Sequence, residues 1–155
     1  MERASPHTVT GVAVGNAMNM ATTLAVYASI CKQTDRPFVF PGSRVQWDSL
    51  TDMTDARQLA KQQLWAATTP AAANQAFNVT NGDVFRWKWM WSRIAEYFGL
   101  PPADYPANLS PLEKQMGDDQ IAWTQIVAKY DLKEPDIGRL VSPWHTDADL
   151  GRPIE

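Results

Sequence analysis

Three short runs rich in β-branched and aromatic residues, each followed by a segment with helical spacing, most constrain the fold of this chain. We predict strands at 7–14 (HTVTGVAV), 37–40 (PFVF) and 76–79 (AFNV), the last of them apolar enough to be buried. The helices expected after them cover 17–32 with Asn16 as N-cap, 55–68, and a Trp-rich segment that follows an Asn-Gly-Asp turn and stops at Gly99. Strands that alternate with helices are typical of an α/β fold. The sequence therefore predicts an α/β chain whose last third is helical and irregular.

Two later segments carry helix-start signals. The tetrapeptide at 110–113 (SPLE) has the form of a capping box. The Ser110 hydroxyl and the Glu113 carboxylate are therefore expected to satisfy free amides of a short helix that ends at Gly117. Another helix is predicted from Asp118 or Asp119 onward, ahead of an irregular tail, and its apolar stripe contains Ile121, Trp123, Ile126, Val127 and Tyr130.

Composition and charge narrow the possible functions. A chain of 155 residues with 45% hydrophobic content can bury one core, and a net charge of −3 provides no positive field for nucleic acid or anionic lipid. No apolar run approaches the ~20 residues of a membrane span. Cys31 is the only cysteine, and we expect it to be buried and inert in a reducing compartment. These features predict a cytoplasmic protein without a nucleic-acid or membrane partner.

The stretch at 78–91 (NVTNGDVFRWKWMW) places three tryptophans at alternate positions, as on one face of a strand. Helical spacing instead sorts Trp87 and Trp91 into an apolar stripe and leaves Trp89 at its margin. Base stacking or membrane attachment would normally use more basic residues than the few present here. We therefore interpret the stretch as a core helix that begins just after an Asn-Gly-Asp turn.

The usual catalytic motifs are missing from the printed residues. Gly11 and Gly15 do not have the spacing of a dinucleotide-binding loop, no tyrosine has a lysine four residues later, and no Gly-x-Ser-x-Gly motif occurs. The segment at 145–149 (HTDAD) resembles part of a metal site, but without a second ligand cluster a solvated loop is the favoured interpretation. The sequence thus predicts no catalytic residue and no metal ligand.

Several long segments nevertheless carry a resemblance. They include HTVTGVAVGNAMNMATTLAVYASICKQ, QWDSLTDMTDARQLAKQQLWAA and QAFNVTNGDVFRWKWMWSRIAEYFGL. Over nearly its whole length, the chain resembles the progesterone 5β-reductase and iridoid synthase-like (PRISE) group of extended short-chain dehydrogenases/reductases. The resemblance implies a Rossmann domain that binds NADPH, a smaller substrate-binding lobe, and reduction of an enone by hydride delivery to its β-carbon.

In that group a Gly-rich loop holds the cofactor, and a tyrosine with a nearby lysine assists at the enone oxygen. By the resemblance, all of these precede Met1, and the family continues beyond Glu155. We therefore expect residues 1–155 to form a single partial domain, the C-terminal part of a Rossmann-type extended short-chain dehydrogenase/reductase. It would contain the last sheet strands and a mostly helical substrate-binding lobe, without the nucleotide-binding part.

The resemblance also implies a cofactor-side segment. The residues that match the family stretch beside the nicotinamide ring are Pro6, His7, Thr8 and Val9, although Ser5 stands where the family commonly has arginine. NADP(H) belongs to the full-length family, and we expect no tight binding of it to this chain alone.

Three further positions match the substrate side. The Asn19 amide could hydrogen-bond a ketone or hydroxyl, or it could make a contact at a helix N-terminus. Trp47 and Trp144 are candidates for the pocket, with simple packing as the alternative for each. The expected ligand is a small apolar enone or carbonyl compound.

Two hypotheses follow. In the first, the chain is the substrate-binding fragment of an NADP-dependent oxidoreductase, inactive alone, with a complementary Rossmann half or a second copy as partner. In the second, it is a non-catalytic ligand-binding or protein-interaction module derived from that lobe.

Overall fold

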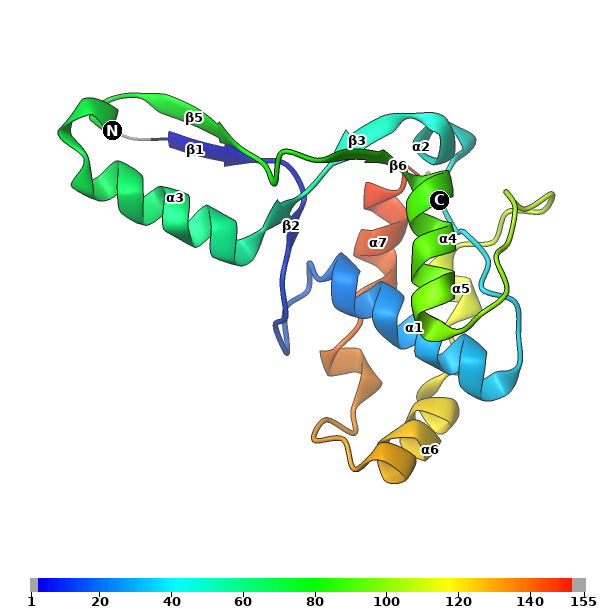
Figure 1. Ribbon diagram of the computed structural model, residues 1–155. Helices are drawn as coiled ribbons and strands as arrows, with labels where there is room; N and C mark the ends of the chain where they lie inside the picture. The colour runs from blue at the N-terminus through cyan, green and yellow to red at the C-terminus, as the bar shows by residue number, and fades with distance from the viewer. Residues whose placement is uncertain (1–2, 152–155) are drawn as a thin grey trace. The chain divides into compact units, whose positions relative to one another are not determined.

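The computed structural model describes residues 3–151 and confirms the α/β architecture, with its elements gathered in two compact units (Figure 1). The first unit comes from Met1–Gly11 and Leu50–Phe85, and the second from Val12–Ser49 and Arg86–Glu155. The single partial domain expected over residues 1–155 remains a prediction, because it refers to the domain of a longer protein.

The first unit is a parallel strand pair with one helix along it (Figure 1). Strand β1 (Arg3–Pro6) pairs with β5 (Ala76–Val79), and helix α3 (Ala56–Thr68) contacts both. Two shorter pairs complete the unit: β2 (Val9–Thr10) with β4 (Thr54–Asp55) in parallel, and β3 (Leu50–Asp52) with β6 (Val84–Arg86). A 3-10 turn, η1 (Pro70–Ala72), follows α3 and ends it as its proline predicts.

The predicted helix at 55–68 and strand at 76–79 are confirmed, but other expectations for this unit are wrong. Only Val79 of the β5 strand is buried, although the whole strand was expected to be. The long strand expected at 7–14 is reduced to β2, because its partner β4 ends at Asp55, just before α3 begins. The β1 and β6 strands were not predicted.

The second unit is helical (Figure 1). Its helices are α1 (Met20–Thr34), α2 (Arg44–Asp48), α4 (Trp87–Phe98), α5 (Leu112–Gln115), α6 (Gln120–Tyr130) and α7 (Pro143–Asp149), with a 3-10 turn η2 (Ile137–Arg139). Helix α1 contacts α4, α6 and α7, while α2 packs on α4 and α5 on α7. Helix α1 is therefore the element around which this unit is built.

Helix α1 begins three residues later than predicted. The Asn19 side chain is the N-cap and accepts a hydrogen bond from the Thr22 amide at 3.2 Å. Asn16, the expected cap, instead accepts from the Met18 amide and shapes a turn ahead of the helix. Two candidate caps thus stand three residues apart, and the one beside the buried stripe starts the helix.

The strand expected at 37–40 does not form, although Phe38 and Phe40 are buried. Side chains satisfy the backbone there: the Trp91 indole donates to the Phe38 carbonyl at 3.0 Å, and the Tyr27 hydroxyl accepts from the Val39 amide at 3.1 Å. The backbone groups that a neighbouring strand would pair are therefore already used. An apolar run this short is buried as readily by side-chain partners as by a sheet.

The Trp-rich stretch is confirmed as a core helix, but strand β6 separates the Asn-Gly-Asp turn from its start at Trp87. In α4, Trp87, Trp91 and Ala95 are buried, whereas Trp89 is 53% exposed under the Arg93 guanidinium. The Trp91 ring stacks on Phe38 with ring centroids 4.0 Å apart. Gly99 ends the helix in the left-handed conformation, with φ of 69°, as its position after the apolar stripe predicts.

The capping box predicted at 110–113 is not used. Helix α5 receives its cap from Asp147, whose carboxylate oxygens accept from the amides of Leu112 at 2.8 Å and Glu113 at 3.1 Å. The solvated loop favoured for 145–149 is also wrong, because these residues belong to α7 and Asp147 is buried. A carboxylate from a distant helix replaces the local hydroxyl, since it satisfies two amides of α5 at once.

Candidate functional site

The segment Pro6–Val9, expected on the cofactor side, begins at the last residue of β1 and ends at the first residue of β2, at the carboxyl end of β1. The Thr8 carbonyl accepts from the Thr54 amide at 3.0 Å, and the buried Thr54 hydroxyl donates to the Val79 carbonyl at 2.6 Å. Thr54 therefore fixes this segment relative to the end of β5. Ligands of open α/β sheets bind beyond the carboxyl ends of parallel strands, which is where this segment lies.

His7 is the exposed polar side chain of this segment. Its Nδ1 lies 3.0 Å from the Asp52 carbonyl oxygen and 3.2 Å from the Asp52 carboxylate. This arrangement orients the imidazole against β3 and leaves the rest of the ring in solvent. The ring could still approach a ligand, but the nitrogen that faces Asp52 is already used.

Asn19 makes the helix contact that the sequence left open. Only 4% of the residue is exposed, and its side chain uses both functions: Oδ1 caps α1, and Nδ2 donates to the Ala13 carbonyl at 2.7 Å. An amide committed in this way shapes the loop before α1. A direct substrate contact by Asn19 stays a prediction.

The two tryptophan candidates have different environments. Trp47 is buried against Phe40 and Tyr105, with ring centroids 4.9 and 5.8 Å away. Trp144, in the first turn of α7, is 52% exposed. Trp144 is therefore open to a ligand from solvent, whereas Trp47 is part of the aromatic core.

Within the second unit, the structure brings Asn19 and Trp144 toward one junction. The Asn19 carbonyl accepts from the Thr23 hydroxyl at 2.7 Å, and the Thr23 oxygen accepts from the Ser142 amide at 2.8 Å. Ser142 lies two residues before Trp144. Trp47 does not take part in this junction, because its partners are the rings of the aromatic core.

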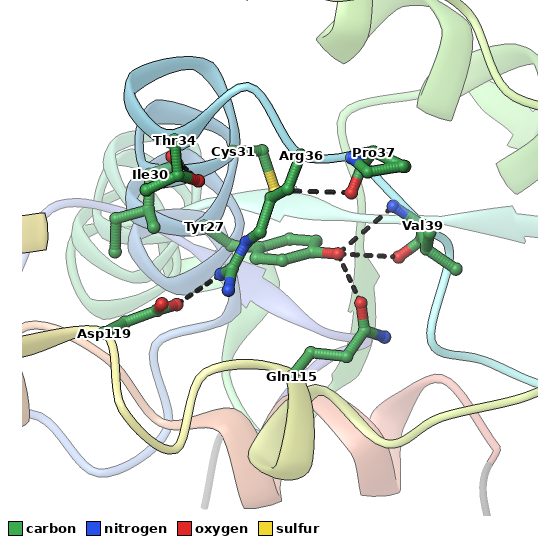
Figure 2. A network of polar contacts seen from close by, with 9 residues as sticks. All are labelled: Tyr27, Ile30, Cys31, Thr34, Arg36, Pro37, Val39, Gln115 and Asp119. Carbon is green, nitrogen blue, oxygen red and sulfur yellow. Dashed lines mark hydrogen bonds and ion pairs between the residues drawn. The ribbon is translucent and has the colours of Figure 1, made fainter.

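A buried polar cluster beside α1 was missed by the sequence reasoning (Figure 2). The Tyr27 hydroxyl lies 2.5 Å from Gln115 Oε1, and the Arg36 guanidinium pairs with Asp119 while lying 5.7 Å from the Tyr27 ring centroid. Burial raises the pKa of Tyr27 far above its usual value. The phenol is therefore neutral at physiological pH, and its hydroxyl links α1 to α5 and to the loop at 37–40 by hydrogen bonds.

The buried state of Cys31 is confirmed, and it leads to a prediction. Burial is the main cause that raises the pKa of the thiol, although the nearby Arg36 opposes it, and Sγ lies 3.6 Å from the Pro37 carbonyl. We expect no reaction with a thiol reagent such as Ellman's reagent at neutral pH, and stoichiometric reaction in guanidinium chloride. Prompt stoichiometric labelling of the folded protein would show that the cluster opens readily.

The described residues do not fit the phosphates of a dinucleotide at two helix N-termini that such a ligand would use. At α1, the Asn19 side chain occupies the Thr22 amide. At α3, the negative Asp55 carboxylate accepts from the Arg57 amide at 2.8 Å, and it would repel a phosphate. Within residues 3–151, no three His, Cys, Asp or Glu side chains form a group that could hold a metal ion.

None of the helices in the described part of the chain has both the length and the apolar character needed to cross a bilayer.

Comparison with known proteins agrees with the architecture. Residues 5–144 match the model of the PRISE-like Rossmann-fold domain. An (S)-8-oxocitronellyl enol synthase of Nepeta racemosa is 40% identical over 146 residues, which cover 94% of this chain and 37% of the relative. A 3-oxo-Δ(4,5)-steroid 5-β-reductase of Arabidopsis thaliana is 36% identical over 148 residues, covering 94% and 38%. The chain thus spans little more than a third of the length of these relatives.

Proposed function

Because the chain belongs to the PRISE-like Rossmann-fold family, we propose that it forms the substrate-binding part of an NADPH-dependent reductase of small apolar enones. The observation that carries the proposal is the match over residues 5–144, together with relatives whose names describe a steroid 5-β-reductase and an enol synthase. NADPH, when bound, supplies the hydride in such a reaction. The tyrosine–lysine pair and the phosphate loop are not among these 155 residues, so we propose that the chain alone does not transfer hydride.

The candidate residues divide into two roles in this proposal. The Pro6–Val9 segment borders the nicotinamide, because it follows the carboxyl end of a parallel strand. On the substrate side, Trp144 contacts the apolar ligand through its exposed ring, and the buried Asn19 shapes the loop beside it, while Trp47 supports the lobe from within the aromatic core. Apolar contact with few polar groups suits a carbon skeleton such as that of a steroid.

We also propose that a complementary Rossmann part packs against the first unit. A two-stranded sheet is marginal by itself, and parallel sheets are normally covered on both faces. Here α3 covers one face, where the Trp65 ring meets Phe77 with centroids 5.1 Å apart. Ala76 and Asn78 point to the opposite face and are exposed. The β1–β5 pair therefore has both an open face and an open edge to offer a nucleotide-binding part.

The second candidate function is that of a non-catalytic ligand-binding module. The exposed apolar side chains of Val14 and Met18 near the start of α1 favour it, because an apolar surface can bind a ligand without a hydride donor. Both candidates place the protein in the cytoplasm, which we infer from its single buried cysteine. They differ in whether a nucleotide-binding part restores catalysis.

The expected result with purified chain, NADPH and a 3-oxo-Δ4-steroid is binding of the steroid without oxidation of NADPH. The physical reason is that the described residues offer a surface for the substrate but no site for the dinucleotide phosphates. Binding is measured by equilibrium dialysis and oxidation by loss of absorbance of the reduced nicotinamide. Turnover at a common enzymatic rate, roughly 1–1000 per second, would contradict this proposal.

A complementation experiment distinguishes the two candidate functions. The part of the Arabidopsis reductase that this chain does not match is expressed separately and added, with the intact reductase as the positive control. NADPH oxidation that appears only in the mixture supports the reductase. Steroid binding without any gain of oxidation supports the ligand-binding module.

A further inference from the structure

The loop that precedes α1, residues 12–18, is fastened along its backbone. The Asn19 side chain donates to the Ala13 carbonyl at 2.7 Å, and the Gly15 amide donates to the Arg139 carbonyl at 2.7 Å. Surface loops are normally mobile because their backbone groups bond to water. In this loop the Ala13 carbonyl and the Gly15 amide instead bond to other protein groups, so the path of the backbone is fixed there.

A second set of hydrogen bonds is centred on Thr23 and joins the start of α1 to Ser142. Thr23 is fully buried, its hydroxyl donates to the Asn19 carbonyl, and its oxygen accepts from the Ser142 amide at 2.8 Å. The Ser142 hydroxyl in turn donates to the Ala17 carbonyl. The Thr23 hydroxyl therefore joins the start of α1 to the residue just before α7, and the Ser142 hydroxyl joins that residue to the loop before the helix.

The side chains carried by this fastened backbone are apolar and exposed. Val14 is 53% exposed, and Met18 is 66% exposed, next to the Ala17 carbonyl that Ser142 holds. Trp144, two residues after Ser142, is half-exposed as well. A flexible loop would carry such side chains to many positions, whereas the backbone that bears them here cannot move without breaking its hydrogen bonds.

Resting on the function proposed above, we propose that Thr23 is a positioning residue of the substrate site. Its hydroxyl holds Ser142, whose own hydroxyl bonds the Ala17 carbonyl of the 12–18 loop, so that Val14, Met18 and Trp144 present a preformed apolar surface to a steroid-sized enone. A surface that is ordered before binding spares the ligand the entropy cost of ordering it. Thr23 acts through these three side chains and does not touch the ligand.

Comparing the binding of a large and a small enone distinguishes a positioning role of Thr23 from a merely structural one. A 3-oxo-Δ4-steroid is long enough to lie across several side chains, whereas cyclohexenone carries the same enone on a single ring. Disorder in the loop should therefore weaken steroid binding and leave cyclohexenone binding nearly unchanged. A merely structural role for Thr23 would weaken both ligands together through partial unfolding.

The test uses the whole chain and the substitution Thr23→Val, which keeps the branched shape and removes the hydroxyl. We expect the dissociation constant for the steroid to rise about tenfold, because the Ser142 amide loses its acceptor, and that for cyclohexenone to stay within about twofold. Thr23→Ser restores the hydroxyl and should restore steroid affinity. The matched control is Thr34→Val in the same helix, whose hydroxyl donates to the Ile30 carbonyl four residues earlier at 2.8 Å and should leave both constants unchanged.

Ser142→Ala provides a second variant, because it breaks the bond to Ala17 without removing a buried hydroxyl from α1. Chemical-shift titration reports binding of both probes, and hydrogen exchange of the Gly15 amide reports whether the loop is released. Faster exchange together with selective loss of steroid affinity supports the proposal. If the wild type binds both probes and the variants change neither or both equally, Thr23 has no positioning role and the proposed function stands. If the wild type binds neither probe, both proposals fall together.

Discussion

Replacing Trp91 with alanine is expected to lower the free energy of unfolding by about 4 kcal/mol. The side chain is fully buried in the second unit, stacks on Phe38 and meets the Phe40 ring edge-on with centroids 5.1 Å apart. Alanine would leave a large cavity between these rings and remove the indole donor of the Phe38 carbonyl. Denaturant unfolding followed by circular dichroism measures the loss.

The matched control lies two residues earlier in the same helix. Trp89→Ala removes a half-exposed ring under Arg93, so we expect a loss below about 1 kcal/mol. Trp91→Phe separates packing from hydrogen bonding, because it keeps a ring but not the indole N–H. Equal losses for Trp91→Ala and Trp89→Ala would contradict the placement of these rings.

The local sequence pattern was sufficient to predict an element whose structure depends mainly on its own residues. The spacing of Trp87, Trp91 and Ala95 predicted both the helix and its buried face, and Gly99 predicted its end. Helix α6 likewise begins after Asp119, although Ile121 of its expected apolar stripe lies in solvent. Periodicity shows that a face is apolar, but the surrounding elements decide which members of that face are covered.

Partners distant in sequence explain the expectations that were wrong. Tyr27 and Trp91 supply hydrogen bonds to the run at 37–40, and they lie 12 and 53 residues from the backbone groups they bond. No window of local sequence contains both sides of the Trp91 bond, and periodicity within a window does not reveal the Tyr27 bond. The chain therefore buries Phe38 and Phe40 in an irregular loop where propensity favoured a strand.

At the candidate site, too, the sequence identified residues by type but did not predict the environment of each side chain. The resemblance selected Asn19, Trp47 and Trp144 together, yet the structure commits the first to a cap, buries the second and exposes the third. Thr23 and Ser142, which join the loop before α1 to α7, are 119 residues apart and carry no motif. Their pairing could be found only from the fold.

Replacing Asp147 with alanine is expected to cost about 3 kcal/mol of unfolding free energy, because two amides at the start of α5 lose a charged acceptor. The Leu112 side chain that follows this cap is fully buried, so these amides cannot turn to water without moving it. Asp147→Asn keeps one acceptor oxygen, and we expect about half the loss. Denaturant unfolding measures both variants, with the exposed Asp118→Ala as the control for removing a carboxylate.

The positions at which hydrogen exchange accelerates distinguish loss of the α5 cap from a general effect of removing a negative charge. Hydrogen exchange at Leu112 and Glu113 should accelerate in Asp147→Ala far more than exchange within α1, since α5 packs on α7 and depends on it for its first hydrogen bonds. The Asp118→Ala control should change neither. If Asp147→Ala left the α5 amides as protected as in the wild type, the Ser110 hydroxyl would be taking over the cap, and the local signal in the sequence would have been the better guide.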